Sequence, residues 1–172
     1  MEIADRLISA HQIEPTDMVA GSSMGGMVAL EIAERLESPH VILIGSAMSR
    51  EEINPMLTLL APLANLTPIR FSQTISGPSA IGFSNMLMKT DPEFVKAMCI
   101  AVSNWSGTNV SAEKVTRLHG THDLIIKCPV DCHRVEGAGH LLAMTHPKEC
   151  VAVTKDSINK MLLVLSQKNS GR

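Results

Sequence analysis

Aromatic residues are scarce in this chain of 172 residues, which contains three Phe, one Trp and no Tyr. The apolar fraction is nevertheless 45%, a normal value for a globular protein, because aliphatic side chains and eleven Met supply it. A chain of this length buries roughly two-thirds of the surface that it exposes when unfolded. We therefore predict a single domain over residues 1–172 with an aliphatic core.

Net charge is also low, since 15 basic residues stand against 17 acidic ones without a long run of either sign. This balance argues against nucleic acid and anionic membrane surfaces as partners. No apolar run approaches the roughly 18 residues of a membrane-spanning helix, and residues 1–10 alternate charged with apolar positions, unlike a signal peptide. We expect a soluble, cytoplasmic protein that contacts neither nucleic acid nor a membrane.

Cysteine is present without a recognisable disulfide or zinc spacing, at positions 99, 128, 132 and 150. Cys128, Cys132 and His133 form only a loose group of metal-ligand types. The sequence therefore predicts neither a metal nor a cofactor.

Hydrophobic periodicity predicts strands that alternate with helices. The expected helices cover 2–12, 25–36 and 150–165, and the expected strands cover 17–22, 41–44, 115–118 and 132–135. The last helix is expected to bury Val151, Ile158, Leu162 and Leu165. This order is typical of an α/β fold, an open parallel sheet flanked by helices in three layers.

Residues 49–110 differ from this pattern, because they carry most of the Pro, Ser, Asn and Met. Helices are expected at 50–65 and 92–105, the second with Asp91 or Thr90 as its cap and Pro92 in its first turn. We predict a small helical cap insertion. Its apolar side chains either roof a substrate pocket or complete the core.

A glycine-rich turn joins the strand at 17–22 to the helix at 25–36. It reads GSSMGG and contains G-x-S-x-G centred on Ser23. A nucleophile on such a sharp turn has a strained backbone, and Gly21 and Gly25 would let the flanking chain pass closely. The alternative is a turn that only packs or holds a phosphate.

Two further polar motifs follow predicted strands: HGTHD, ending at Asp123, and EGAGH, ending at His140. Because the carboxyl ends of parallel strands meet at one sheet edge, Ser23, Asp123 and His140 can converge there. Of the remaining polar residues we expect only local roles: strand-end packing for His119, solvent exposure for His122, capping or exposure for Glu136, and a helix start for His146.

The order Ser, Asp, His and these three motifs resemble the α/β-hydrolase superfamily, in particular its small esterase-like members. The resemblance implies Ser23 as nucleophile, His140 as general base and Asp123 as the residue that orients it. It also implies the backbone N–H of Met24 as an oxyanion donor, with Ser22 flanking the substrate site, although the Ser22 side chain fits a structural role better. The apolar side chains of residues 49–110 favour a small apolar carboxylic ester as substrate. The same triad would also serve thioester, lactone or carbon–carbon bond hydrolysis, and the sequence does not choose among them.

The chain departs from the family pattern in lacking the amino-terminal strands and the loop that supplies the second oxyanion donor. The nucleophile strand would then have one bare edge, which either a second copy covers in a homodimer or the amino-terminal helix shields. Between Gly120 and Cys132 the crossover is short enough to reduce its usual helix to a turn. Two alternatives to an enzyme remain: a catalytically weak binding or scaffold protein, and a nucleotide-binding module, which would lack the P-loop lysine.

Overall fold

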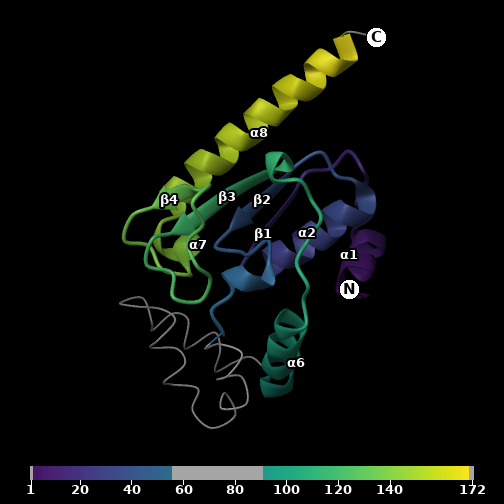
Figure 1. The fold of residues 1–172 in the computed structure, drawn as a ribbon. Coiled ribbons are helices and arrows are strands. Elements are labelled where there is room, and N and C mark those ends of the chain that lie inside the picture. The colour runs from purple at the N-terminus through teal and green to yellow at the C-terminus, as the bar shows by residue number, and fades with distance from the viewer. Residues whose placement is uncertain (1, 56–90, 171–172) are drawn as a thin grey trace.

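The structure is a computed structural model that describes residues 2–55 and 91–170. Its elements, in chain order, are α1 (Glu2–His11), β1 (Val19–Ser22), α2 (Met24–Leu36), β2 (Val41–Ile44), η1 (Arg50–Glu52), α6 (Pro92–Ser103), η4 (Ala112–Lys114), β3 (Val115–Gly120), β4 (His133–Val135), α7 (Leu142–Thr145) and α8 (Pro147–Ser170). The four strands form one sheet in the order β1-β2-β3-β4, and every neighbouring pair is parallel. The parallel α/β architecture predicted from the sequence is confirmed (Figure 1).

Strand β2 lies in the middle of the sheet and has the bounds that the sequence predicted. Val41 pairs with Val19 of β1 on one side and with Val115 of β3 on the other. Its first three residues are buried, which is the pattern of a strand covered by helices on both faces. Strand β1 is shorter than predicted because Asp17 closes a turn with Glu14, through its own N–H and its carboxylate.

Helices cover both faces of the sheet. On one face α2 packs Leu30 and Ala33 against Val41 and Leu43, and α1 lies outside α2 (Figure 1). On the other face α7 and α8 pack against Ile42, Leu118 and Val135. The resulting layers are aliphatic, with Trp105 as the aromatic residue of the larger core cluster.

The last helix differs from its prediction. It begins at Pro147, a residue suited to the first helical turn, and continues to Ser170. Val151 and Leu162 were expected to be buried but are exposed by 50% and 55%, so the prediction was wrong for these two residues. Ile158, from the same prediction, is partly buried and packs against the core cluster that contains Ile42 and Leu118. Cys150 and Ser157 are buried instead, because only the first half of α8 lies over the sheet and its end projects beyond it (Figure 1).

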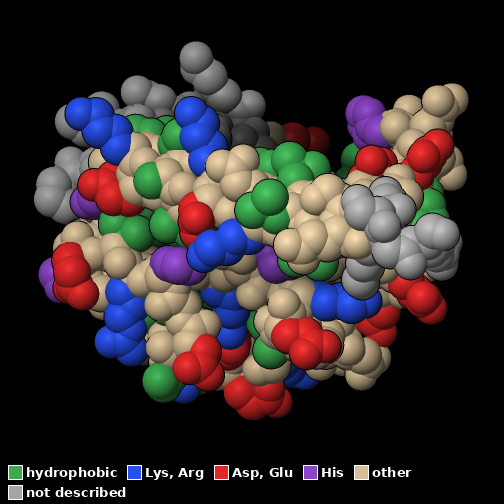
Figure 2. Space-filling model, turned by 90° about the horizontal axis from the view of Figure 1, so that it is seen from above, with side chains coloured by type: hydrophobic (Ala, Val, Ile, Leu, Met, Phe, Trp, Pro, Cys, Tyr) green, Lys and Arg blue, Asp and Glu red, His purple; other side chains and the backbone are tan. Residues whose placement is uncertain are grey.

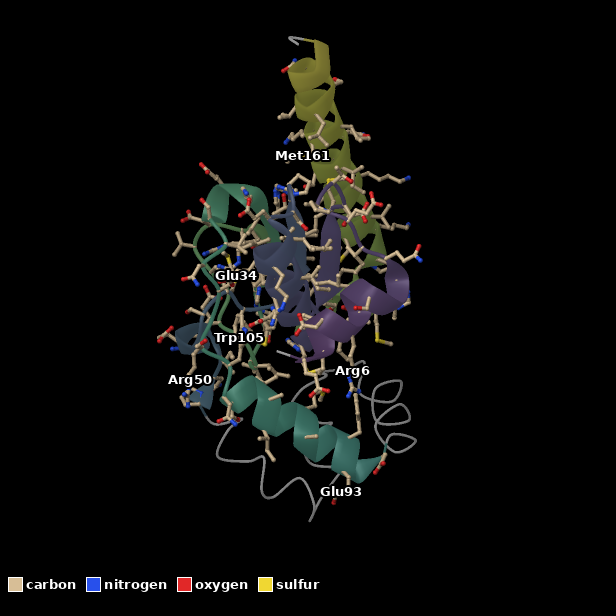
Figure 3. The ribbon with its side chains drawn as sticks, turned by 90° about the vertical axis from the view of Figure 1, so that its right-hand side faces the viewer. Arg6, Glu34, Arg50, Glu93, Trp105 and Met161 are labelled. Carbon is tan, nitrogen blue, oxygen red and sulfur yellow. The ribbon has the colours of Figure 1, made fainter. Side chains whose placement is uncertain are left out.

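The segment that returns from α6 to β3 is fastened to α2. Trp105 donates its Nε1–H to Glu31 over 2.9 Å, and Asn109 donates its side-chain amide to Glu34 over 2.7 Å. Trp105 and Glu34 are labelled in Figure 3. Asp91 caps α6 by accepting the Glu93 N–H over 3.0 Å, as its sequence position predicted. These contacts join the chain that follows α6 to helix α2.

The predicted cap insertion is only partly described. Residues 50–52 form a single 3₁₀ turn at the start of the helix predicted over 50–65, and residues 56–90 lie outside the described part of the chain. The single domain with a cap over 49–110 therefore stays a prediction.

Strand β1 forms one edge of the sheet, since among the described strands only β2 pairs with it. An open groove of about 560 Å³ runs beside it, lined by apolar residues of β1, α1 and α2 such as Val19, Leu7 and Ile32. The second copy expected to cover this edge stays a prediction.

Charged side chains of both signs are interspersed on the face seen from above (Figure 2).

In the described part of the chain no helix combines the length and the apolar character needed to cross a bilayer.

Candidate active site

The turn between β1 and α2 holds Ser23 in a strained conformation, with φ 53° and ψ −129°. Only a few per cent of residues other than glycine have positive φ, and such residues concentrate at functional sites. Gly21 makes the turn feasible, because a Cβ there would collide with the backbone carbonyl of Gly25. The sharp turn predicted from GSSMGG is thus present in the backbone.

Gly25 itself does not have the packing role predicted for it, since a Cβ at this position would meet no described atom within 4 Å. That role belongs to Gly26, where a Cβ would collide with the side chain of Ser46. Ser46 follows β2 at the same sheet edge and donates its hydroxyl to the Ser23 carbonyl over 2.7 Å. Gly26 therefore lets α2 approach the residue that holds the turn.

The structure brings the three predicted catalytic residues together. The Oγ of Ser23 lies 2.8 Å from Nε2 of His140, and Nδ1 of His140 lies 2.9 Å from Oδ2 of Asp123. Ser23 follows β1, Asp123 follows β3 and His140 follows β4, so all three stand at the carboxyl ends of parallel strands. His140 is 5% exposed, and the Asp123 side chain is fully buried.

Asp123 is buried with hydrogen bonds to both oxygens. Its Oδ1 accepts the backbone N–H groups of Ile125 and Ile126 over 2.8 and 3.1 Å, and its Oδ2 faces two imidazoles, those of His140 and His119. Burial alone would raise the pKa of Asp123, but these hydrogen bonds and the charge of His140 outweigh it and hold the pKa well below its usual range. Asp123 is therefore a carboxylate at neutral pH.

This depressed pKa predicts an acid-sensitive fold. Because the folded protein holds Asp123 ionised more strongly than the unfolded chain does, the contribution to stability is complete above about pH 4 and is lost as the pH falls below it. Urea unfolding near pH 7 and near pH 3 should show a larger loss of unfolding free energy for the wild type than for Asp123→Asn. Asp131→Asn, a change at an exposed aspartate, should keep the wild-type pH dependence. Equal pH dependence in wild type and Asp123→Asn would contradict this assignment.

The loop from β3 to β4 contains no helix, in keeping with the short crossover expected from the sequence. Ile126 of this loop forms an isolated antiparallel β-bridge with Ile53. The carbonyl oxygen of Ile126 also lies 3.0 Å from Nε2 of His119 on β3. These contacts fix the segment that carries Asp123.

Met24 begins α2 directly after the nucleophile, and the first N–H groups of a helix lack intrahelical acceptors. Its N–H is therefore suited to an oxyanion, as predicted, while Ser22 is an exposed residue of β1. No second oxyanion donor is identified among the described residues. The oxyanion and substrate-binding roles of Met24 and Ser22 stay predictions.

The secondary polar candidates have mostly local contacts. His122 is exposed, Glu136 is exposed and accepts the Thr121 hydroxyl over 3.3 Å, and His146 directly precedes α8. His119, expected only to pack, also contacts Asp123, which the sequence reasoning missed although HGTHD places the two residues four apart. Sequence reasoning also missed Ser46, whose only signal is its place after a buried strand.

A second hydroxyl and imidazole cluster lies at the opposite sheet edge, where β2 and β3 begin. Nε2 of His40, Oγ1 of Thr116 and Oγ of Ser157 are 2.8 to 3.0 Å apart. Burial lowers the pKa of His40, and its Nδ1 has no partner among the described residues. Without a carboxylate on that nitrogen the cluster lacks the third member of a triad, and it fastens α8 to the sheet.

The described residues include no group of three or more His, Cys, Asp or Glu side chains placed to hold a metal. The Sγ atoms of Cys128 and Cys132 lie 3.8 Å apart, and the neighbouring His133 is exposed.

Neither a family model nor a curated protein sequence matches the chain. Solved structures do: a carboxylesterase of Nitrososphaera gargenis has 14% identity and a TM-score of 0.70, with 94% of this chain and 72% of the other covered. A thermophilic esterase from Thermogutta terrifontis has 18% identity and a TM-score of 0.68, with 92% of this chain and 70% of the esterase covered. A hydrolase from Pseudomonas aeruginosa PA01 has 15% identity and a TM-score of 0.68, with 89% of this chain and 68% of the hydrolase covered.

The chain therefore has an α/β-hydrolase fold, and it spans 68 to 72% of the length of these three proteins. The fold resemblance inferred from the three sequence motifs is confirmed.

Proposed function

We propose that the protein is a serine hydrolase that cleaves small apolar carboxylic esters, or thioesters, through an acyl-enzyme. The observation that carries the proposal is the continuous hydrogen-bonded line from Ser23 through His140 to Asp123, with contacts of 2.8 and 2.9 Å. The strained backbone of Ser23 supports it independently. The esterases among the structural neighbours support the choice of ester chemistry.

The ionised Asp123 determines which nitrogen of His140 acts. A carboxylate oxygen can only accept, so Nδ1 of His140 carries the hydrogen and Nε2 presents a lone pair to the Ser23 hydroxyl. In the first step Oγ of Ser23 attacks the carbonyl carbon while its proton passes to Nε2. The Met24 N–H stabilises the resulting oxyanion.

The tetrahedral intermediate collapses when the bond to the leaving oxygen or sulfur breaks and Nε2 of His140 returns the proton to that atom. The acyl group then remains on Ser23. Water repeats the sequence: its proton goes to Nε2, its oxygen bonds the carbonyl carbon, and Ser23 leaves with the proton as the carboxylic acid is released. The cycle needs no cofactor. We also propose that the protein acts in the cytoplasm, as expected from the sequence.

One observation favours a second candidate, a weakly catalytic binding or scaffold protein with the same fold. Only one oxyanion donor, Met24, is identified among the described residues, and loss of one donor typically lowers kcat by about a hundredfold or more. The two candidates differ in whether an acyl-enzyme forms.

Stopped-flow hydrolysis of p-nitrophenyl acetate and butyrate distinguishes them. The proposal predicts a burst of nitrophenolate close to one equivalent per active site, and an acyl group on Ser23 in intact-mass and peptide spectra. Ser111→Ala is the matched control, because Ser111 is exposed and precedes β3 at the opposite sheet edge. It should retain the full burst. A folded protein that gives no burst of nitrophenolate and carries no acyl group on Ser23 would favour the scaffold.

A further inference from the structure

His119 is a fully buried imidazole that the reaction described above does not use. It lies on β3, which pairs with strands on both sides, and its side chain is 1% exposed. Its Nε2 stands 3.0 Å from the carbonyl oxygen of Ile126 and 3.1 Å from Oδ2 of Asp123. The second of these atoms is the one that accepts the Nδ1–H of His140.

The surroundings of His119 determine its tautomer. Both atoms that face Nε2 are acceptors, so Nε2 carries the hydrogen and shares it between them. Nδ1 is buried and has no partner among the described residues. A hydrogen on Nδ1 would be buried without an acceptor among the described residues, which is unfavourable, so the geometry favours the tautomer with its hydrogen on Nε2.

The two oxygens of the Asp123 carboxylate accept hydrogen bonds from different parts of the chain. Its Oδ1 is bound by N–H groups of its own loop, while Oδ2 has one donor on the central strand β3 and one on His140. His140 gains and loses a proton in every catalytic cycle. Of the two donors to Oδ2, His119 is the one that lies on a strand paired on both sides.

We propose that His119 is a positioning residue for the hydrolase reaction: its Nε2–H ties Oδ2 of Asp123 and the Ile126 carbonyl to β3, and so keeps Oδ2 in line with Nδ1 of His140. This inference rests on the proposed function for its catalytic consequence. The geometric part of the proposal does not depend on whether Ser23 is reactive. It states that His119 shares its hydrogen between Asp123 and Ile126, and that this affects the contact between Asp123 and His140.

The first measurement uses the unaltered protein. Two-bond ¹H–¹⁵N correlation spectra assign the tautomer of each histidine, and His119 should carry its hydrogen on Nε2. A hydrogen on Nδ1, or on both nitrogens, would overturn the proposal without recourse to any variant.

The second measurement follows the hydrogen between His140 and Asp123 as a downfield, exchange-protected proton resonance. The resonance should be present in the wild type, lost or broadened in His119→Leu, and recovered in His119→Gln, whose amide N–H replaces the donor. His133→Leu is the matched control, because His133 is an exposed histidine of the neighbouring strand. An unchanged resonance in folded His119→Leu protein contradicts the proposal. If that variant does not fold, His119→Phe takes its place.

Kinetics then separate positioning from a general structural role. His119→Leu should lower kcat for p-nitrophenyl butyrate by about tenfold to a hundredfold, the range for residues that orient a functional side chain, with little change in KM. In an Asp123→Ala background the same substitution should change kcat less than about twofold, because it acts through Asp123. An equal loss in both backgrounds would overturn the proposal. Failure of Ser23 to acylate would instead overturn the proposed function and leave the spectroscopic result standing.

Discussion

Ser23→Ala is expected to lower kcat for ester hydrolysis by about five to six orders of magnitude. The substitution removes the atom that attacks the carbonyl carbon, and His140 alone cannot form an acyl-enzyme. The fold should remain intact, because the backbone contacts of the turn, from the Ser23 N–H to Ile44 and from Ser46 to the Ser23 carbonyl, do not use the Ser23 hydroxyl. Initial rates with p-nitrophenyl butyrate and a urea unfolding curve provide the two measurements.

Ser111→Ala controls for loss of a serine hydroxyl and should keep the wild-type kcat. Substantial activity in folded Ser23→Ala protein would show that another group attacks the ester, and would contradict the assigned nucleophile.

Asp123→Asn is expected to lower kcat about ten-thousandfold with little change in KM. The amide of an asparagine can donate to Nδ1 of His140, which moves the imidazole hydrogen to Nε2 and leaves no lone pair for the Ser23 hydroxyl. The substitution changes almost no volume, so the loss reports chemistry rather than packing. Steady-state kinetics at neutral pH measure it.

Asp131→Asn makes the same chemical change at an exposed position of the same loop and should leave kcat unaltered. A loss of less than about tenfold in Asp123→Asn would mean that His140 does not depend on Asp123 for its tautomer.

Several features of the fold could be predicted because they depend on local sequence. Strand β2 is a short β-branched run between Pro39 and Gly45, and its predicted bounds were correct. The turn at Ser23 was predictable because the need for glycine at Gly21 arises within the turn itself, where a Cβ would collide with the Gly25 carbonyl. The convergence of Ser23, Asp123 and His140 followed from the rule that parallel strands end at one edge.

Other features depend on contacts between distant segments and have no local signal. Gly26 rather than Gly25 has the packing role because of Ser46, which follows the next strand in the chain, β2. The apolar periodicity of α8 continues past the sheet, so Leu162 fits the pattern of a buried residue although it is more than half exposed in the described part of the chain. His119 resembled a simple strand end because its partner, the Asp123 carboxylate, is reached only when the loop turns back.

The most direct test of a catalytic Ser23 is covalent labelling with a fluorophosphonate, followed by intact-mass and peptide mass spectrometry. A serine hydrolase with this site should take up one phosphonyl group per chain, located on Ser23. The labelling rate should fall sharply in Asp123→Asn and to zero in Ser23→Ala, and should be unchanged in Ser111→Ala. Folded wild-type protein that stays unlabelled, or that is labelled equally at another serine, would contradict the assignment of Ser23 as an activated nucleophile.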